Sequence, residues 1–473
     1  MVFTSITFLA LFLPAFLAVY YLIPQKHLAW RNAVLLVFSV IFYSWGGVRY
    51  LGLLLFSVTV NYLSGLFVGP ERGLRIRKAG LTLSIVLNLA VLCVFKYAGF
   101  ISSVFRGAGI MVPQVSIALP IGISFYTFQG MSYVLDVYRG KAKVSRNPLT
   151  VALYISLFPQ LVAGPIVRYA DVANELTARE HTIGCFASGT VRFMLGFAKK
   201  LLLADAMGAI TDRAFLRTGT ELLTLPLSWI GIVAFALQIY FDFSAYSDMA
   251  IGLGRMAGFH FSENFRDPYL SASVTEFWRR WHISLSTWFR DYVYIPLGGN
   301  RCTKPRQAFN LLLVWTLTGL WHGANWTFLA WGVYYGVLIL IEKFVIRDRI
   351  DKIPGWIRHL LTMLLVLFGW VFFRADSITD ACVYFRSMFG MNEGAKWGEA
   401  VYVLRENVWE IFASFLFLFP WKQKIMQWNE ALGEGKGRAA IQILITVFSV
   451  AAFIVAYGKL ASGSFSPFIY FQF

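Results

Sequence analysis

Long apolar runs recur along the whole chain and are separated by short polar segments. Because an α-helix needs about 20 apolar residues to cross a bilayer, this pattern predicts an all-α, polytopic membrane protein. The first run, MVFTSITFLALFLPAFLAVYYLIP, has no basic start and no small-residue cleavage site, so we expect a retained helix rather than a signal peptide. We expect roughly 10 to 12 crossings, together with re-entrant or interfacial helices. Further candidate spans lie near 32–46, 49–68, 80–97, 117–136, 149–166, 188–203, 225–241, 309–341, 359–374, 407–420 and 439–457.

One apolar stretch is too long for a single crossing. From Arg306 to Glu342 the chain advances 36 residues, which would be about 54 Å of helix against a hydrocarbon core of about 30 Å. A break near Leu320–Asn325 would place His322, in the stretch GLWHGANW, deep in the membrane beside irregular backbone. An ionisable ring at that depth favours a functional role, and neutral imidazole is an ordinary general base near pH 7. The alternative is structural, because GLWHG is also a G-x-x-x-G helix-packing motif.

The least hydrophobic interior block covers residues 260–308 and is rich in aromatic side chains. Ser273 followed by Glu276 predicts a capping box that opens a helix. His282 shares one face of this predicted helix with an apolar stripe. The stripe consists of Trp278, Trp281, Leu285, Trp288, Phe289 and Tyr292. An interfacial helix anchored by tryptophans explains the rings, but it does not explain a histidine on the apolar face.

The arginines of the same predicted helix have different surroundings. Arg279 and Arg290 fall away from the apolar stripe, whereas Arg280 lies four residues after Glu276 and should pair with it. Pro296 and the glycine pair that follows it are expected to end the element.

A second polar cluster, QIYFDFSAYSDMA, follows directly on an apolar span. Its carboxylates, Asp242 and Asp248, need partners at that depth, and the arginines between 279 and 290 are the expected ones. Tyr240 belongs to the same cluster. A structural network of ion pairs and hydrogen bonds remains as open as a role in an active site.

Composition agrees with the membrane prediction. The chain is 58% hydrophobic and 14% charged, with a mean hydropathy of +0.62. Its net charge of +17 lies in short loops rather than on one face, so we expect basic cytoplasmic loops and no nucleic-acid partner. Because the loop 98–114 carries only Arg106, the positive-inside rule places the N-terminus outside. The basic residues of the neighbouring loops are Arg72, Arg75, Arg77 and Lys78, then Arg139, Lys141, Lys143 and Arg146.

Other templates of site chemistry do not match. The four cysteines form no C-x-x-C pair, and no His/Cys cluster has the spacing of a zinc site, so we expect no metal and no disulfide framework. The chain has no P-loop, no G-x-S-x-G elbow, no H-E-x-x-H and no Rossmann fingerprint, so we also expect no bound cofactor.

Several stretches together resemble the membrane-bound O-acyltransferases, in particular the branch that serves bacterial alginate O-acetylation. Relatives of this branch act in cellulose acetylation, peptidoglycan O-acetylation and teichoic-acid D-alanylation. The stretches that carry the resemblance are MVFTSITFLALFLP, LPIGISFYTFQGMSYVLDVYRG, LFPQLVAGPIVRY, YFDFSAYSDMAIGLG, ENFRDPYLSASVTEFWRRWHISLSTWFRDYVYIPLGGNR and GLWHGANW.

The resemblance implies one membrane domain over residues 1–473, built around a central funnel. Within it we expect N-terminal helices in 1–230, a catalytic core in 231–345 and C-terminal helices in 346–473. The family's deep catalytic histidine maps onto His322, and its second characteristic histidine maps onto His282.

The same resemblance implies acetyl-CoA as a cytoplasmic acyl donor. It also implies an SGNH-type acetyltransferase partner on the other side, which modifies a polysaccharide such as alginate or cellulose. As residues of the donor site or channel we add Asn325, Trp321, Arg279, Arg280, Asp242, Tyr240 and Asp248. Asn325 would orient His322 or donate to the developing oxyanion.

Other functions stay open. Peptidoglycan O-acetylation and teichoic-acid D-alanylation are alternatives within the family. A proton-coupled transporter with His322 as a relay is the rival from another class, and it predicts further ionisable groups at matching depth. A non-catalytic scaffold for an exopolysaccharide synthase is the third.

Overall fold

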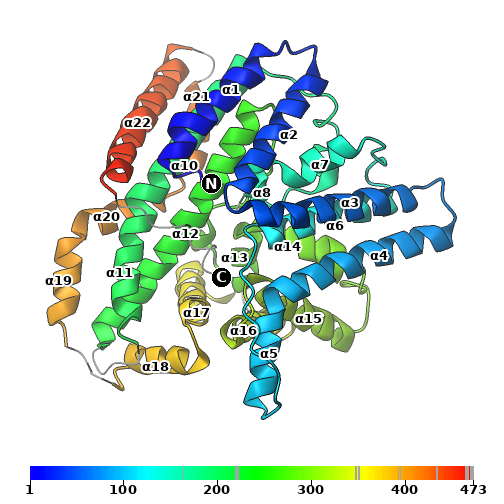
Figure 1. Cartoon of the computed structure of the whole chain (residues 1–473). Coiled ribbons are helices and arrows are strands. Elements are labelled where there is room, and N and C mark those ends of the chain that lie inside the picture. Colours follow the sequence, from blue (N-terminus) through cyan, green and yellow to red (C-terminus); the bar gives the residue numbers. More distant parts are fainter. Residues whose placement is uncertain are drawn as a thin grey trace. The chain divides into compact units, whose positions relative to one another are not determined.

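Every regular element that the computed structural model describes is a helix. The structure describes residues 1–162, 164–218, 223–346, 349, 352–392, 394, 396–432, 435–463 and 468. The chain divides into two compact units. Unit 1 comprises Met1–Phe193 and Tyr246–Glu263, and unit 2 comprises Met194–Ala245 and Asn264–Phe473. Figure 1 labels most of the helices of both units.

Unit 1 begins with aromatic helices and continues with a long helical hairpin. Its helices are α1 (Leu13–Leu22), α2 (Leu28–Ser44), α3 (Leu51–Phe67), α4 (Leu74–Leu92), α5 (Ala98–Gly107), α6 (Ile123–Tyr138), α7 (Pro148–Ser156), α8 (Phe158–Leu161), α9 (Tyr169–Val172) and most of α10 (Ile183–Ala198). Short π- or 3-10-helical turns occupy Phe8–Phe12, Val48–Tyr50 and Cys93–Tyr97.

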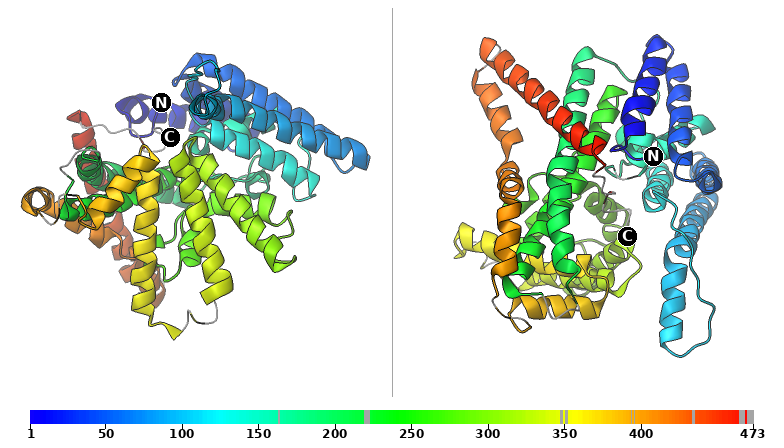
Figure 2. Two further views of the ribbon diagram at one scale, coloured as in Figure 1. Left: turned by 90° about the horizontal axis from the view of Figure 1, so that it is seen from below. Right: turned by 60° about the vertical axis from the view of Figure 1, so that its left-hand side comes forward.

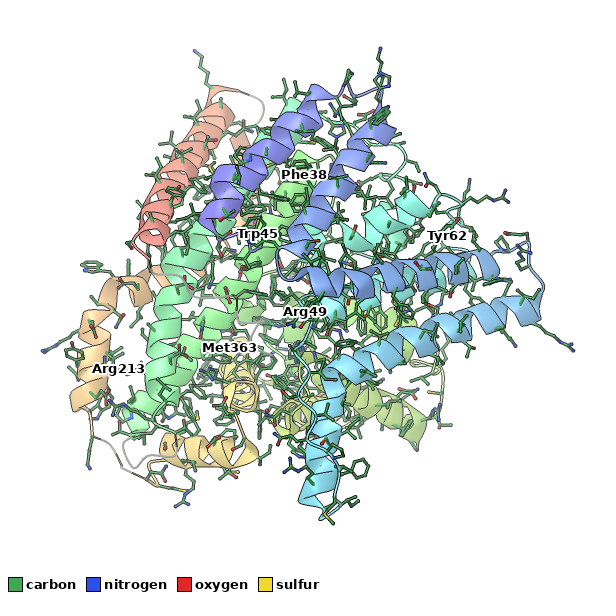
Figure 3. The ribbon with its side chains drawn as sticks, in the orientation of Figure 1. Phe38, Trp45, Arg49, Tyr62, Arg213 and Met363 are labelled. Atoms are coloured by element: carbon green, nitrogen blue, oxygen red, sulfur yellow. The ribbon has the colours of Figure 1, made fainter. Side chains whose placement is uncertain are left out.

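Neutral polar side chains join the two arms of the hairpin in unit 1. Helices α3 and α4 lie side by side (Figure 1). Between them, Nδ2 of Asn61 donates to Oδ1 of Asn88 at 3.1 Å, and Ser84 donates to Oδ1 of Asn61 at 3.0 Å. At the far end of α3, the hydroxyl of Tyr62, labelled in Figure 3, donates to the carbonyl of Arg146. Uncharged hydrogen bonds of this kind join helices where lipid supplies no hydrophobic driving force.

Unit 2 contains the longest helix and the block that the sequence singles out. Its helices are α11 (Asp205–Phe215), the first part of α12 (Leu225–Met256), α13 (Val274–Arg280), α14 (Ile283–Phe289), α15 (Lys304–His322), α16 (Trp326–Ile341), α17 (Gly355–Arg374), α18 (Ile378–Met388), α19 (Gly398–Glu406), α20 (Val408–Phe417), α21 (Trp421–Leu432) and α22 (Lys436–Ala461). Short π- or 3-10-helical turns occupy Lys199–Ala204, Pro268–Leu270, Arg290–Tyr294 and Glu342–Ile346.

Helices α15, α16 and α17 lie side by side in unit 2 (Figure 2). Glycines set how closely the first two approach: a Cβ at Gly319 would collide with the carbonyl oxygen of Phe328, and one at Gly332 with that of Trp315. Close backbone approach through small residues is the usual packing mode of membrane helices. The glycine at 319 therefore has its packing partner on α16.

Charged side chains join α11 to α19 near the other edge of unit 2. Arg213 of α11, labelled in Figure 3, binds Glu399 at 3.0 Å and Glu406 at 3.4 Å. Both carboxylates belong to α19. These side chains are partly exposed, so the contact orients the two helices more than it stabilises them.

Within the residues that the structure describes, six helices are long and apolar enough to cross a membrane: Val48–Phe67, Leu74–Gly107, Leu225–Met256, Trp326–Ile346, Gly355–Arg374 and Lys436–Ala461. Shorter apolar helices cover Phe8–Leu22, Leu28–Ser44 and Val408–Phe417. The number of crossings, 10 to 12 in our estimate, stays a prediction.

The predicted span over 149–166 is wrong as a single helix. Helix α7 ends at Ser156, and α8 covers only Phe158–Leu161. Leu157 between them has ψ 109°, which is not helical. Pro159 explains the interruption, because a proline cannot continue a helix but suits the first turn of a new one.

Candidate active site

His322 is the last residue of α15 and lies at the break between α15 and α16. Gly323 adopts an extended conformation, and α16 starts at Trp326 with Asn325 as its N-cap. The break predicted near Leu320–Asn325 is therefore confirmed. The His322 side chain is 4% exposed and contacts the rings of Trp321, Trp331 and Phe373, whose centroids lie 5.0–5.2 Å away.

His282 lies in a second backbone break of unit 2. Helix α13 ends at Arg280 and α14 begins at Ile283, so the continuous helix predicted through this block is wrong. His282 between them has φ +44°, in the left-handed region that non-glycine residues rarely occupy. The predicted inward orientation is confirmed, because the ring is 1% exposed and packs edge-on against Phe243 at 4.6 Å.

The two breaks bring the two histidines together. The ring centroids of His282 and His322 lie 6.4 Å apart, and Trp321 contacts both rings. Trp321 is 3% exposed. Of the residues that the sequence nominated, these three form one group.

Asn264 holds the turn at His282, and our sequence analysis missed it. Its backbone carbonyl accepts from Ile283 at 2.9 Å, and its Oδ1 accepts from the backbone N–H of Ser284 at 3.2 Å. The same Oδ1 lies 3.2 Å from Nδ1 of His282. Asn264 thus caps α14 from 18 residues earlier in the chain, a separation that no local spacing rule covers.

The first turn of α13 is capped twice. Oγ of Ser273 accepts from the N–H of Glu276, as the capping box predicts, and the Glu276 carboxylate accepts from Ala272. A carboxylate from beyond α16 adds a second cap, because Glu342 accepts from the N–H groups of Val274 and Thr275. These bonds satisfy orphan donors of the helix start and fix α13 to α16.

Tryptophans and tyrosines surround the histidine pair. Trp278 of α13 packs between Trp315, Trp331 and Tyr335 at 4.8–5.3 Å. Trp281 contacts Phe277, Phe265, Tyr240, Tyr269 and Trp370. Tyr240, nominated from the sequence, therefore belongs to the aromatic wall beside His282. The wall keeps water from the imidazoles and strengthens electrostatic interactions there.

Asp242 pairs with a lysine that the sequence analysis did not nominate. Nζ of Lys200 lies 3.1 Å from Oδ1 of Asp242 and also binds the carboxylate of Asp205. Lys200 and Asp242 are each 2% exposed. The expected partners, the arginines between 279 and 290, are thus replaced at Asp242 by Lys200. Lys200 and Asp242 are far apart in sequence, and only the fold brings them together.

Burial and charge oppose each other in this cluster. Burial alone would lower the pKa of Lys200, but Asp242 and Asp205 hold it above its ordinary value. Burial raises the pKa of Asp205 to about 6, against the opposing effect of Lys200. The cluster is therefore ionic, with one carboxyl that titrates near neutrality.

Asp248 belongs to unit 1 rather than to the histidine pair. Nη2 of Arg192 lies 2.8 Å from Asp248 and also contacts the carboxylate of Glu263. Nη1 of Arg192 donates to Glu263 at 2.8 Å. The expected partners between 279 and 290 are replaced here by Arg192. An arginine bound by two carboxylates in this way is typical of a structural ion-pair network.

The remaining nominated residues have helix-terminal or surface positions. Arg279 is exposed, and Arg280 pairs with Glu276 at 2.7 Å, as predicted. The amide of Asn325 accepts from Thr327 at 3.3 Å and donates to the carbonyl of Asp376 at 2.9 Å. In this structure the Asn325 amide caps α16 and tethers the chain after α17.

His282 contributes a neutral imidazole to the histidine pair. Burial lowers the pKa of His282 to about 3, so its imidazole is uncharged at neutral pH. Its Nε2 is buried and has no hydrogen-bond partner among the residues that the structure describes. A neutral ring nitrogen in a dry, aromatic setting can accept a proton or a hydrogen bond from a hydroxyl or amide.

Comparison with known proteins shows the family of the chain. Residues 81–375, which include both histidines, match the membrane-bound O-acyltransferase family. The chain is 42% identical to a "Probable alginate O-acetylase" of Azotobacter vinelandii, with all of both chains covered. It is 46% identical to a protein of the same name from Pseudomonas aeruginosa, over 82% of this chain and 75% of the relative. A "Peptidoglycan O-acetyltransferase" of Helicobacter pylori is 31% identical over 83% of this chain and 80% of its own. The chain therefore belongs to the membrane-bound O-acyltransferase family, and it is a multi-pass membrane enzyme that transfers acyl groups to oxygen.

Proposed function

We propose that this enzyme takes an acetyl group from cytoplasmic acetyl-CoA and passes it across the bacterial inner membrane, where an extracytoplasmic polysaccharide is O-acetylated. Alginate is the polymer that we favour, because two relatives at 42% and 46% identity carry alginate O-acetylase names. The relative named for peptidoglycan O-acetylation is more distant, at 31%.

The observation that carries the proposal is the pair of buried imidazoles. His282 and His322 lie 6.4 Å apart between ring centroids, each at a backbone break and each surrounded by aromatic rings. Two buried, adjacent histidines are costly to a merely structural core, since each must keep its polar nitrogens satisfied. They suit a reaction in which a proton leaves a hydroxyl and reaches a leaving thiolate.

In the proposed step His322 is the general base. It takes the proton of the incoming hydroxyl while the oxygen forms a bond to the acetyl carbonyl carbon. The C–S bond of the thioester then breaks, and the proton on His322 passes to the thiolate of CoA. The products are an O-acetyl ester and CoA with a free thiol, so no other reactant is needed.

Delivery to the outside completes the proposal. The short basic loops would lie in the cytoplasm and would attract the phosphates of CoA, and the N-terminus would lie outside. An SGNH-type acetyltransferase would then act as the extracytoplasmic partner. The acceptor hydroxyl would belong to this partner or to the polymer.

One structural feature supports the alternative of a proton-coupled transporter. Lys200, Asp205 and Asp242 form a buried group of ionisable side chains, which is the kind of feature that a proton pathway requires. This reading predicts proton flux that does not depend on acetyl-CoA. Proteoliposomes with a pH-sensitive dye inside measure that flux directly.

The polymer specificity can be tested in membranes that contain the enzyme and its partner. Acetyl-labelled acetyl-CoA is supplied together with alginate, cellulose or peptidoglycan fragments, and label in the isolated polymer is counted. We expect incorporation into alginate that is lost in His322→Ala and retained in His27→Ala, which changes an exposed histidine. Incorporation into another polymer alone would contradict the assignment of alginate. Proton flux without acetyl transfer would contradict the enzymatic reaction.

A further inference from the structure

Two donors fix the identity of the atom on Asn264 that faces His282. The backbone N–H of Ser284 can only donate, and it lies 3.2 Å from this atom, so the atom is the carbonyl oxygen Oδ1 and not the amide nitrogen. Oγ of Ser284 donates to the same oxygen at 2.9 Å. Asn264 therefore presents an acceptor to the imidazole.

An acceptor at this position determines which imidazole nitrogen carries the proton. Nδ1 of His282 lies 3.2 Å from Oδ1 of Asn264. A lone pair on Nδ1 would face the oxygen lone pairs, whereas a proton on Nδ1 makes a hydrogen bond. Oγ of Ser284, 3.4 Å from Nδ1, has already used its own proton on Asn264 and can only accept. The neutral ring thus carries its proton on Nδ1 and a lone pair on Nε2.

We propose that Asn264 and Ser284 are positioning residues that hold His282 in this tautomer, so that Nε2 accepts a hydrogen bond from an N–H or O–H group of the substrate. The proposal rests on the proposed acyl transfer for its substrate, but the tautomer itself does not depend on it. Nε2 is buried and has no hydrogen-bond partner among the described residues, as expected of a group kept for a ligand.

The tautomer also restricts what His282 can do. A neutral ring without a proton on Nε2 cannot donate to the oxyanion of a tetrahedral intermediate. Protonation at Nε2 would require the imidazolium, which burial opposes. His282 therefore positions a donor group, such as the attacking hydroxyl or an amide N–H of the CoA arm.

Among the ring contacts of His282 that the structure describes, one is with another titratable ring, that of His322. Its ring contacts are Phe243 from α12 and Trp321 and His322 from α15. Nearby on its own segment, Arg280 is engaged with Glu276. Of these described groups, His322 is the one expected to change the protonation of His282 in the wild type.

The tautomer can be measured without any activity. Solid-state ¹⁵N NMR of histidine-labelled protein in lipid separates protonated from unprotonated ring nitrogens, and the signals absent in His282→Gln identify this residue. We expect a protonated Nδ1 and an unprotonated Nε2 at pH 7. A proton on Nε2 would overturn the proposal. If the expected tautomer is found but no acetyl transfer occurs, the proposed function is contradicted and the tautomer proposal stands.

Variants of Asn264 test the positioning role. Asn264→Leu should lower acetyl transfer roughly 10-fold to 100-fold, the range seen when the hydrogen-bond partner of a metal-binding histidine is removed, and should mix the tautomers. Asn264→Asp keeps the acceptor oxygen and places a carboxylate beside the ring, which raises its pKa by about 1 to 3 units. At high pH, Asn264→Asp should therefore regain activity. As the solution is acidified, this variant should lose activity at a higher pH than the wild type does.

A matched control separates positioning from folding. Asn310 is another buried asparagine of unit 2, and its Nδ2 donates to the carbonyl of Leu297. Asn310→Leu should change neither the His282 tautomer nor the pH profile, whatever it does to stability. Normal transfer and an unmixed tautomer in Asn264→Leu would overturn the role of Asn264. If Asn264→Leu does not fold, the wild-type spectrum and the pH profile of Asn264→Asp decide the question.

The partner of Nε2 can be assigned from kinetics. In His282→Gln, an increase in KM for acetyl-CoA alone points to an amide N–H of the donor. A lower kcat or a higher KM for the acceptor alone points to the attacking hydroxyl. Unchanged values of all three would overturn the hydrogen bond to substrate.

Discussion

Two buried polar clusters of unit 2 are equally well shielded from solvent but are built from opposite chemistry. His282 is 1% exposed and its ring is held by the neutral groups of Asn264 and Ser284. Lys200 is 2% exposed and is held by the carboxylates of Asp205 and Asp242. Burial alone therefore does not decide whether a polar group is neutral or charged, because its partners decide.

The difference separates a group kept for chemistry from one used for structure. The imidazole at 282 keeps a nitrogen that can accept a hydrogen bond, since its partners occupy only Nδ1. The Lys200 ammonium has a pKa above its ordinary value and is committed to two carboxylates. The two clusters should accordingly respond to substitution and to pH in different ways.

The largest effect on stability is expected at the ionic cluster. Lys200→Met leaves Asp205 and Asp242 buried without their cation, which should destabilise the fold by about 3–5 kcal/mol. Thermal unfolding in lipid nanodiscs measures the loss. The additional change Asp205→Asn should restore part of it, and a loss below about 1 kcal/mol would mean that the cluster is solvated.

Acid should destabilise the protein through His282. Its pKa is about 3 in the folded state and about 6.5 in the unfolded chain. The unfolded state therefore binds more protons below pH 6.5, and stability falls as the pH is lowered. Between pH 7 and pH 5 we expect a loss of about 2 kcal/mol. His282→Gln should abolish this part of the pH dependence, and an unchanged dependence would contradict a buried neutral ring.

Acid should act in the opposite direction through Asp205. Its pKa is about 6 in the folded state and about 3.9 in the unfolded chain. Its contribution to stability is present at low pH and is lost as the pH rises through 6. Between pH 7 and pH 5 the gain should be about 1 kcal/mol, and it should be missing in Asp205→Asn. A steeper loss in acid for this variant than for the wild type supports the assignment, and parallel curves contradict it.

An exposed ion pair provides the smallest effect and a reference for the buried one. Arg280 and Glu276 pair at 2.7 Å with about a third of each side chain exposed. Arg280→Ala should cost about 0.3–0.5 kcal/mol, because solvent and salt screen the interaction. A double-mutant cycle with Glu276→Ala isolates the pair. If the coupling energy of this pair were as large as the stability loss in Lys200→Met, charge and not burial would set the strength of both ion pairs.

The break at His322 could be predicted from sequence because it depends on length alone. The stretch from Arg306 to Glu342 would be longer than a bilayer is thick if it were one helix. Its break was expected near Leu320–Asn325, where His322 and Asn325 lie. The capping box at Ser273 and the pair of Arg280 with Glu276 could be predicted because their partners lie three or four residues apart. Patterns of three or four residues contain enough information for such contacts.

The break at His282 could not be predicted in this way. The aromatic spacing from Trp278 to Tyr292 fits one helix, but Asn264 stabilises a left-handed residue in its middle through tertiary hydrogen bonds. The partners of Asp242 and Asp248 were also missed, because Lys200 and Arg192 lie 42 and 56 residues away. Each of these contacts depends on how separate helices pack, and spacing along the chain does not encode it.

His322 is proposed to be the base of an acetyl transfer. The most direct measurement is release of CoA from acetyl-CoA by purified enzyme in lipid with its acceptor, for the wild type, His322→Ala and the exposed-site control His27→Ala. We predict a loss of about 10² to 10⁴-fold in kcat for His322→Ala, with the tautomer signals of His282 retained. Turnover in His322→Ala equal to that of the wild type would contradict the account.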